Sequence, residues 1–140
     1  MVINMNIKKV FLSAIVICCL LWCYPVNANE EIEHDNLSNL NDIVLKLLVP
    51  QIQTTVDDFY SPYLTTSPIV VYYMAKIVEI KNNELSIEVF PYVGAHNSVG
   101  KDRITFDISN AGQVTLKSFI HIKSYALPPH LQSRIKKPLP

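Results

Sequence analysis

The chain has 140 residues, of which 49% are hydrophobic, and it carries 12 Lys plus Arg against 12 Asp plus Glu. This length leaves room for one domain of ordinary size and not for two. The balanced charge argues against nucleic-acid binding driven by phosphate neutralisation, which needs a basic surface. All three cysteines lie in the first 28 residues, so the rest of the chain has no disulfide and its stability must come from burial.

Residues 1–28 have the organisation of an export signal. Lys8 and Lys9 form a positive n-region, residues 10–24 are uncharged and apolar, and a small residue, Ala28, ends the segment. We predict cleavage after Ala28, which gives a secreted or extracytoplasmic product. The alternative is an uncleaved membrane anchor, and it is the only route by which we expect this chain to contact a membrane.

A helix is predicted after the cleavage point. Residues 29–36 are acidic and polar, and we expect them to be flexible up to the capping residue Asp35 or Asn36. Pro50 removes one backbone donor, so a helix over about 36–59 should be either bent or divided into two abutting helices. The apolar residues that recur at helical spacing are Leu37, Leu40, Val44, Leu47 and Leu48.

Two hairpins follow. Residues 69–80 are rich in β-branched and aromatic side chains and residues 85–89 alternate between apolar and polar, with Asn82 and Asn83 at the turn between them. Residues 103–108 and 114–122 repeat this pattern around a second turn. In the last of these strands the alternation shifts its phase around Ser118, where we expect a β-bulge.

These elements predict an α+β fold, in which one helix packs on a four-stranded antiparallel meander over residues 37–126. The element order resembles the cystatin-like arrangement, an analogy of order alone. We expect Leu47 and Phe106 at the centre of the helix–sheet interface. Residues 127–140 are proline-rich and basic, and we expect them to form an extended tail that leaves the sheet near Tyr125.

The long connection between the hairpins, residues 91–103, is the place where a binding site is expected, because loops carry sites more often than strands do. No catalytic residue is predicted: Ser98 lacks the turn of a hydrolase nucleophile, and the glycines do not match a phosphate loop. The histidines have no metal-site spacing, so no metal and no cofactor is predicted. The candidate binding residues are His96, Asn97, Asp102, Arg103, His121, Tyr125 and His130.

Three stretches carry a family resemblance. They are LLVPQIQTTVDDFYSPYL at 47–64, FPYVGAHNSVGKDRITFDIS at 90–109 and HIKSYALPPHLQ at 121–132. Together they resemble domain-of-unknown-function family 3888, small exported proteins of Gram-positive, spore-forming bacteria, over about residues 40–132. The resemblance implies a domain boundary and an exported location, and it brings no activity, cofactor or ligand.

We therefore expect an exported interaction domain rather than an enzyme, acting at the cell envelope or outside the cell on an unidentified ligand or protein. The export signal, the abundant tyrosines and the long loop motivate this hypothesis. The alternative is a small envelope-directed hydrolase or a metal-binding protein that uses the loop. In that case His96 would be the base or metal ligand and Asp102 its orienting partner.

Overall fold

The computed structural model describes residues 28–140, so the predicted export segment lies outside the described residues except for Ala28. Helix α2 (Ala28–Tyr60) includes residues 29–36, for which the sequence predicts a flexible segment. No glycine or proline interrupts the chain between Ala28 and Val49, and the helix therefore has no reason to begin later. Within residues 28–140, none of the helices combines the length and apolar character needed to cross a membrane.

Helix α2 continues through Pro50 as a single helix. Its buried face consists of Leu45, Leu48, Ile52, Val56 and Tyr60, spaced three or four residues apart. The prediction that Leu47 lies at the centre of the interface is wrong, since its side chain is 71% exposed. The run from Ile43 to Val49 is apolar on almost every side of the helix, so its periodicity did not determine which side faces the sheet.

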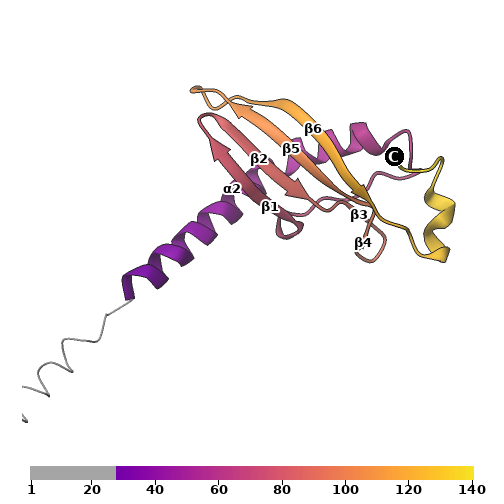
Figure 1. Cartoon of the computed structure of the whole chain (residues 1–140), viewed down its shortest axis with the longest axis horizontal. Helices are drawn as coiled ribbons and strands as arrows, with labels where there is room; N and C mark the ends of the chain where they lie inside the picture. The colour runs from indigo at the N-terminus through magenta and orange to yellow at the C-terminus, as the bar shows by residue number, and fades with distance from the viewer. Residues whose placement is uncertain (1–27) are drawn as a thin grey trace, which may run out of the picture. The chain divides into compact units, whose positions relative to one another are not determined.

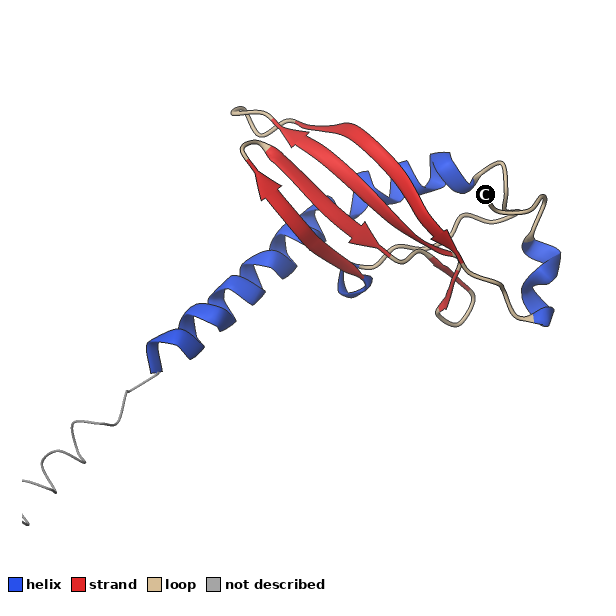
Figure 2. Cartoon of the chain, in the orientation of Figure 1, coloured by secondary structure: helices blue, strands red, loops and turns tan. Residues whose placement is uncertain are grey.

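The predicted four-stranded meander is confirmed. Strands β1 (Ala75–Lys81), β2 (Glu84–Val89), β5 (Gly100–Ile108) and β6 (Val114–Ser124) form an antiparallel sheet in the order β1-β2-β5-β6. The second half of α2 lies along one face of this sheet (Figures 1 and 2). The fold is α+β, and its element order fits the cystatin-like arrangement.

The turns and the bulge follow from local sequence. Asn82 has φ 54° and Gly112 has φ 79°, the left-handed conformation that asparagine and glycine tolerate best. The β5–β6 register shifts between Thr105, which faces Ser118, and Phe106, which faces Leu116. This extra residue in β6 confirms the bulge predicted near Ser118.

The connection between the hairpins is itself partly ordered. It holds a small two-stranded sheet made of β3 (Tyr92–Val93) and β4 (Asn97–Ser98). A short 3-10 helix, η1 (Tyr72–Met74), precedes β1, and an isolated bridge joins Ile69 to Tyr92. The loop is therefore held against the segment that leads into the first strand.

The C-terminal segment packs on the domain instead of leaving it as an extended tail. It contains the 3-10 helix η2 (Pro129–Arg134), whose Leu131 is buried in the core. Ile135 forms a bridge with Leu64, and the Lys136 amide donates a 2.8 Å hydrogen bond to the Tyr63 carbonyl. Composition suggested an extended tail, but its apolar residues add to the core.

The helix–sheet interface gives a direct test of this architecture. Phe106 is buried in the core that α2 and the sheet share, so Phe106→Ala should lower the free energy of unfolding by about 3–5 kcal/mol. Leu47→Ala removes an exposed side chain from α2 and should cost less than about 0.5 kcal/mol. Guanidinium titrations of both variants measure the two costs, and equal losses would contradict the observed orientation of α2.

Candidate functional site

Four polar side chains form a hydrogen-bonded row along one face of strands β5 and β6, beginning at the last residue of α2. Asp102 on β5 is 0% exposed, and its carboxylate accepts two hydrogen bonds. The Tyr60 hydroxyl donates to Oδ2 at 3.0 Å, and Nδ1 of His121 lies 2.6 Å from Oδ1. On the far side of the imidazole ring, Nε2 lies 2.8 Å from the Ser124 hydroxyl. We call Tyr60, Asp102, His121 and Ser124 the polar chain.

Strand register explains why His121 and Ser124 meet. Residues three apart in a regular strand point to opposite faces of a sheet. Here Asp102 is paired with His121 while Gly100 is paired with Ser124, so β6 has one residue more than β5 over this stretch. The extra residue, Ile122, interrupts the alternation of side chains in β6, so that the Ser124 side chain points to the same face as that of His121. His121 and Ser124 consequently lie on the same face as Asp102.

Aromatic packing fixes the imidazole ring. The Phe59 ring stacks on His121 with centroids 5.2 Å apart, and it also stacks on Phe119 at 4.5 Å. Tyr60 meets the imidazole edge-on. The His121 side chain is only 11% exposed, so its orientation is set by these rings and by Asp102.

Burial controls the protonation of two members of the polar chain. Burial raises the pKa of Asp102, and the hydrogen bonds from His121 and Tyr60 and the His121 charge only partly oppose this effect. Burial also raises the pKa of Tyr60, and the negative charge and hydrogen bond of Asp102 raise it further. Tyr60 therefore stays a neutral phenol, and its hydroxyl group donates a hydrogen bond to Asp102.

Gly100 lies directly beside the polar chain. A Cβ atom at this position would overlap the Tyr60 hydroxyl. It would also lie 2.8 Å from Cε1 of His121 and 2.9 Å from the Lys123 carbonyl oxygen. The space that a larger residue would need is taken by these groups, so this position requires glycine for close approach.

Of the residues predicted for a binding site, the structure joins Asp102 and His121 directly. His96 lies apart from them, at the exposed turn between β3 and β4, where it has φ 58° and its ring stacks on Tyr92 at 4.7 Å. Asn97 begins β4 and is half-buried. Asp102 therefore orients His121, and the pairing of Asp102 with His96 that the hydrolase alternative assigned does not occur.

Arg103 belongs to a surface ion cluster. It binds Glu88 at 2.7 Å on the neighbouring strand β2, and Lys101 binds the other Glu88 oxygen at 2.8 Å. The hydrogen bond from Lys101 lowers the pKa of Glu88 most, and the hydrogen bond from Arg103 lowers it further. Arg103 is thus engaged within the sheet.

The two remaining predicted residues lie in the C-terminal segment. The Tyr125 amide donates a 3.0 Å hydrogen bond to the Val99 carbonyl, and the Lys123 ammonium lies 5.3 Å from the Tyr125 ring centroid. His130 is exposed within η2. Across residues 28–140, no group of three or more His, Cys, Asp or Glu side chains is arranged to hold a metal ion.

Sequence reasoning missed Tyr60 and Ser124. Tyr60 has a readable signal, because it continues the buried stripe of α2 one turn after Val56. Ser124 has none, because regular alternation puts it on the opposite face from His121. Only the extra residue Ile122 brings it into place.

A comparison with models of known protein families identifies the family of this protein. A family model described as "Protein of unknown function (DUF3888)" matches residues 40–123. The chain belongs to this family. The comparisons with curated proteins and with solved structures gave no match. The DUF3888 match includes Tyr60, Asp102 and His121 and ends one residue before Ser124.

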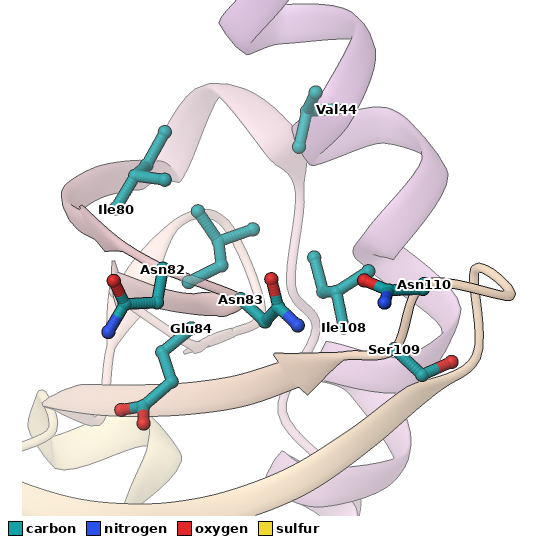
Figure 3. A pocket seen from close by; sticks show the side chains of 9 residues that line it. Val44, Ile80, Asn82, Asn83, Glu84, Ile108, Ser109 and Asn110 are labelled. Atoms are coloured by element: carbon teal, nitrogen blue, oxygen red, sulfur yellow. The ribbon is translucent and has the colours of Figure 1, made fainter.

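The DUF3888 domain also has a hollow at the other end of the sheet, of about 350 Å³. We call it the tip hollow, because it lies between α2 and the tips of the two hairpins (Figure 3). Its apolar lining comes from Val44, Ile80, Leu85 and Ile108. Its polar lining residues are Asn82, Asn83, Glu84, Ser109 and Asn110. A lining that combines apolar side chains with polar ones is typical of ligand sites.

The close approach at Gly100 predicts coupling between two substitutions. Gly100→Ala should lower the free energy of unfolding by about 1–3 kcal/mol, because the new methyl group overlaps the Tyr60 hydroxyl. In a Tyr60→Phe background the same change should cost at least about 0.5 kcal/mol less, since the hydroxyl is absent. A double-mutant cycle by denaturant titration measures the coupling, and strictly additive losses would contradict it.

The raised pKa of Asp102 predicts a pH-dependent loss of stability. In the unfolded chain Asp102 titrates near 3.8, whereas in the folded chain it keeps its proton to higher pH. As pH rises through this window, the unfolded state ionises first, so the free energy of unfolding falls relative to Asp102→Asn. The difference levels off once the folded state has also ionised.

Denaturant titrations of the wild type and Asp102→Asn from acid to neutral pH give this difference directly. Asp58, an exposed aspartate near the end of α2, offers the matched control, Asp58→Asn. As pH rises, the free energy of unfolding of the wild type should show no such fall relative to that of Asp58→Asn. A wild-type stability that rises with pH relative to Asp102→Asn would contradict the account.

Proposed function

We propose that this DUF3888 domain is an exported interaction domain that binds an apolar segment of a polypeptide partner at the tip hollow. The observation that carries the proposal is a row of exposed leucine and isoleucine side chains on α2 beside the hollow. These residues are Leu40, Ile43 and Leu47, each more than half exposed. Binding at this surface requires no catalytic group.

The arrangement of the row supports binding. Leu40, Val44 and Leu47 follow one another at helical spacing, and Val44 also lines the hollow. Ile80 lines the hollow from β1 and is 68% exposed. Burying a side chain of this size against a partner stabilises a complex by about 1.5–3 kcal/mol. A partner that covers several of them gains this free energy at each one, against the entropy lost on association.

The polar lining residues suit a polypeptide. Asn82, Asn83 and Asn110 provide side-chain amides, which donate and accept hydrogen bonds as a peptide backbone does. Asn83 and Asn110 come from the tips of different hairpins and lie on either side of Ile108 in Figure 3. An apolar anchor in the hollow and amide contacts at its edge would together fix a peptide segment.

The alternative of a hydrolase or metal-binding protein built on the His96 loop has less support. Asp102 is occupied by Tyr60 and His121, and the His96 ring stacks on Tyr92 at an exposed turn. His96 therefore lacks the orienting carboxylate that this alternative assigned to it.

The location belongs to the proposal as well. Export rests on the organisation of residues 1–28, and a Gram-positive, spore-forming source and an envelope or extracellular site of action rest on the family resemblance. Intact-mass measurement of the protein from culture medium should give a chain that begins at Asn29. A mass equal to that of the full chain would contradict cleavage.

Binding at the tip hollow is tested with two matched variants. Ile80→Ser changes an exposed side chain that lines the hollow, and Ile120→Ser changes an exposed side chain on β6, paired with Arg103. Envelope proteins retained on the immobilised chain, quantified by mass spectrometry, should fall at least about tenfold with Ile80→Ser and stay unchanged with Ile120→Ser. Equal retention by the two variants, or no retention by the wild type, would contradict the proposal.

A further inference from the structure

The polar chain has a chemical property that goes beyond the binding proposed above. Asp102, His121 and Ser124 stand in the order of acid, base and nucleophile. The Asp102–His121 distance is 2.6 Å and the His121–Ser124 distance is 2.8 Å, both within hydrogen-bond reach. A base that contacts the nucleophile with one ring nitrogen and a carboxylate with the other is the arrangement used in acyl transfer.

Burial separates the acid from the other two residues. Asp102 is fully buried, whereas His121 and Ser124 are both partly buried, with Ser124 at the end of β6. The acid is thus shielded from water and holds the imidazole. Tyr60 fixes the second oxygen of Asp102, which leaves the first oxygen for His121.

A main-chain oxygen already lies against Ser124. The Ser124 hydroxyl donates a 2.8 Å hydrogen bond to the main-chain oxygen of Pro140, the last residue of the sequence. While the hydroxyl proton is used there, the hydroxyl oxygen can only accept a hydrogen bond from an N–H at Nε2 of His121, and the ring then carries protons on both nitrogens. When another group replaces the Pro140 oxygen and Nε2 has released its proton to water, the hydroxyl can turn its own proton toward Nε2, and His121 then acts as a base.

We propose that Ser124 is a nucleophile that takes the acyl group of a small carboxylic ester, with His121 as its base and Asp102 and Tyr60 as positioning residues. Ser124 Oγ forms a bond to the ester carbonyl carbon while its proton passes to Nε2. The carbonyl electron pair moves to oxygen and returns as the bond to the leaving alcohol breaks. The alcohol takes the proton from Nε2. Water then repeats the sequence on the acyl-serine, releasing the acid and restoring Ser124.

The test uses 4-nitrophenyl acetate on the full chain, with release of nitrophenolate followed by absorbance and the acetyl group located by peptide mass mapping. The wild type should carry the acetyl group on Ser124, and Ser124→Ala should lose it. Ser118→Ala, which removes another β6 serine, should react like the wild type. His121→Gln should slow acetylation of Ser124 about 100-fold or more.

A second pair of variants keeps the proposal testable if His121→Gln does not fold, which circular dichroism would reveal. Ser124→Cys and Ser118→Cys place one thiol beside His121 and one away from it. Iodoacetamide should alkylate the thiol at 124 at least about tenfold faster at neutral pH, because the neighbouring base favours the thiolate. Nitrophenolate release by the wild type no faster than by Ser124→Ala, or equal alkylation at the two positions, would overturn the proposal.

Discussion

The buried carboxylate of Asp102 is the constraint on which this end of the domain depends. A buried charge or polar acid is tolerated only where hydrogen bonds replace water, and here one donor comes from the last residue of α2 and the other from β6. The helix end and two strands are thereby held in one arrangement. Gly100 is part of the same constraint, because the Tyr60 hydroxyl reaches Asp102 through space that a side chain at position 100 would fill.

The elements of the fold were largely readable from sequence, because each has a local cause. Alternation located the strands, Asn82 and the turn at Gly112 located the hairpins, and the phase change at Ser118 located a bulge. The orientation of α2 was not readable, since apolar residues surround the helix near Leu47 and only contact with the sheet selects the buried side. The C-terminal segment was predicted wrongly for a related reason. Its proline-rich, basic composition does not indicate that two of its leucines, Leu127 and Leu131, are buried against the domain.

The candidate site was readable only in part. Asp102 was singled out as a polar residue of the loop and His121 as a histidine of the family pattern, but nothing local indicates that they form a cross-strand pair. Tyr60 lies 42 residues from Asp102, and Ser124 reaches His121 only because Ile122 is inserted in the register. Contacts of this kind depend on strand register and on the helix end together, which a single sequence does not specify. The domain consequently has the polar chain at one end of the sheet and the tip hollow at the other.

The proton on Nδ1 of His121 tests the central claim most directly, because the polar chain requires Nδ1 to donate a hydrogen bond to Asp102. Proton NMR of the ¹⁵N-labelled protein should show an Nδ1–H resonance for His121 that is protected from exchange with water. That resonance should disappear in Asp102→Asn and persist in Ser124→Ala. A His121 ring whose Nδ1 proton exchanges freely in the wild type would contradict the account.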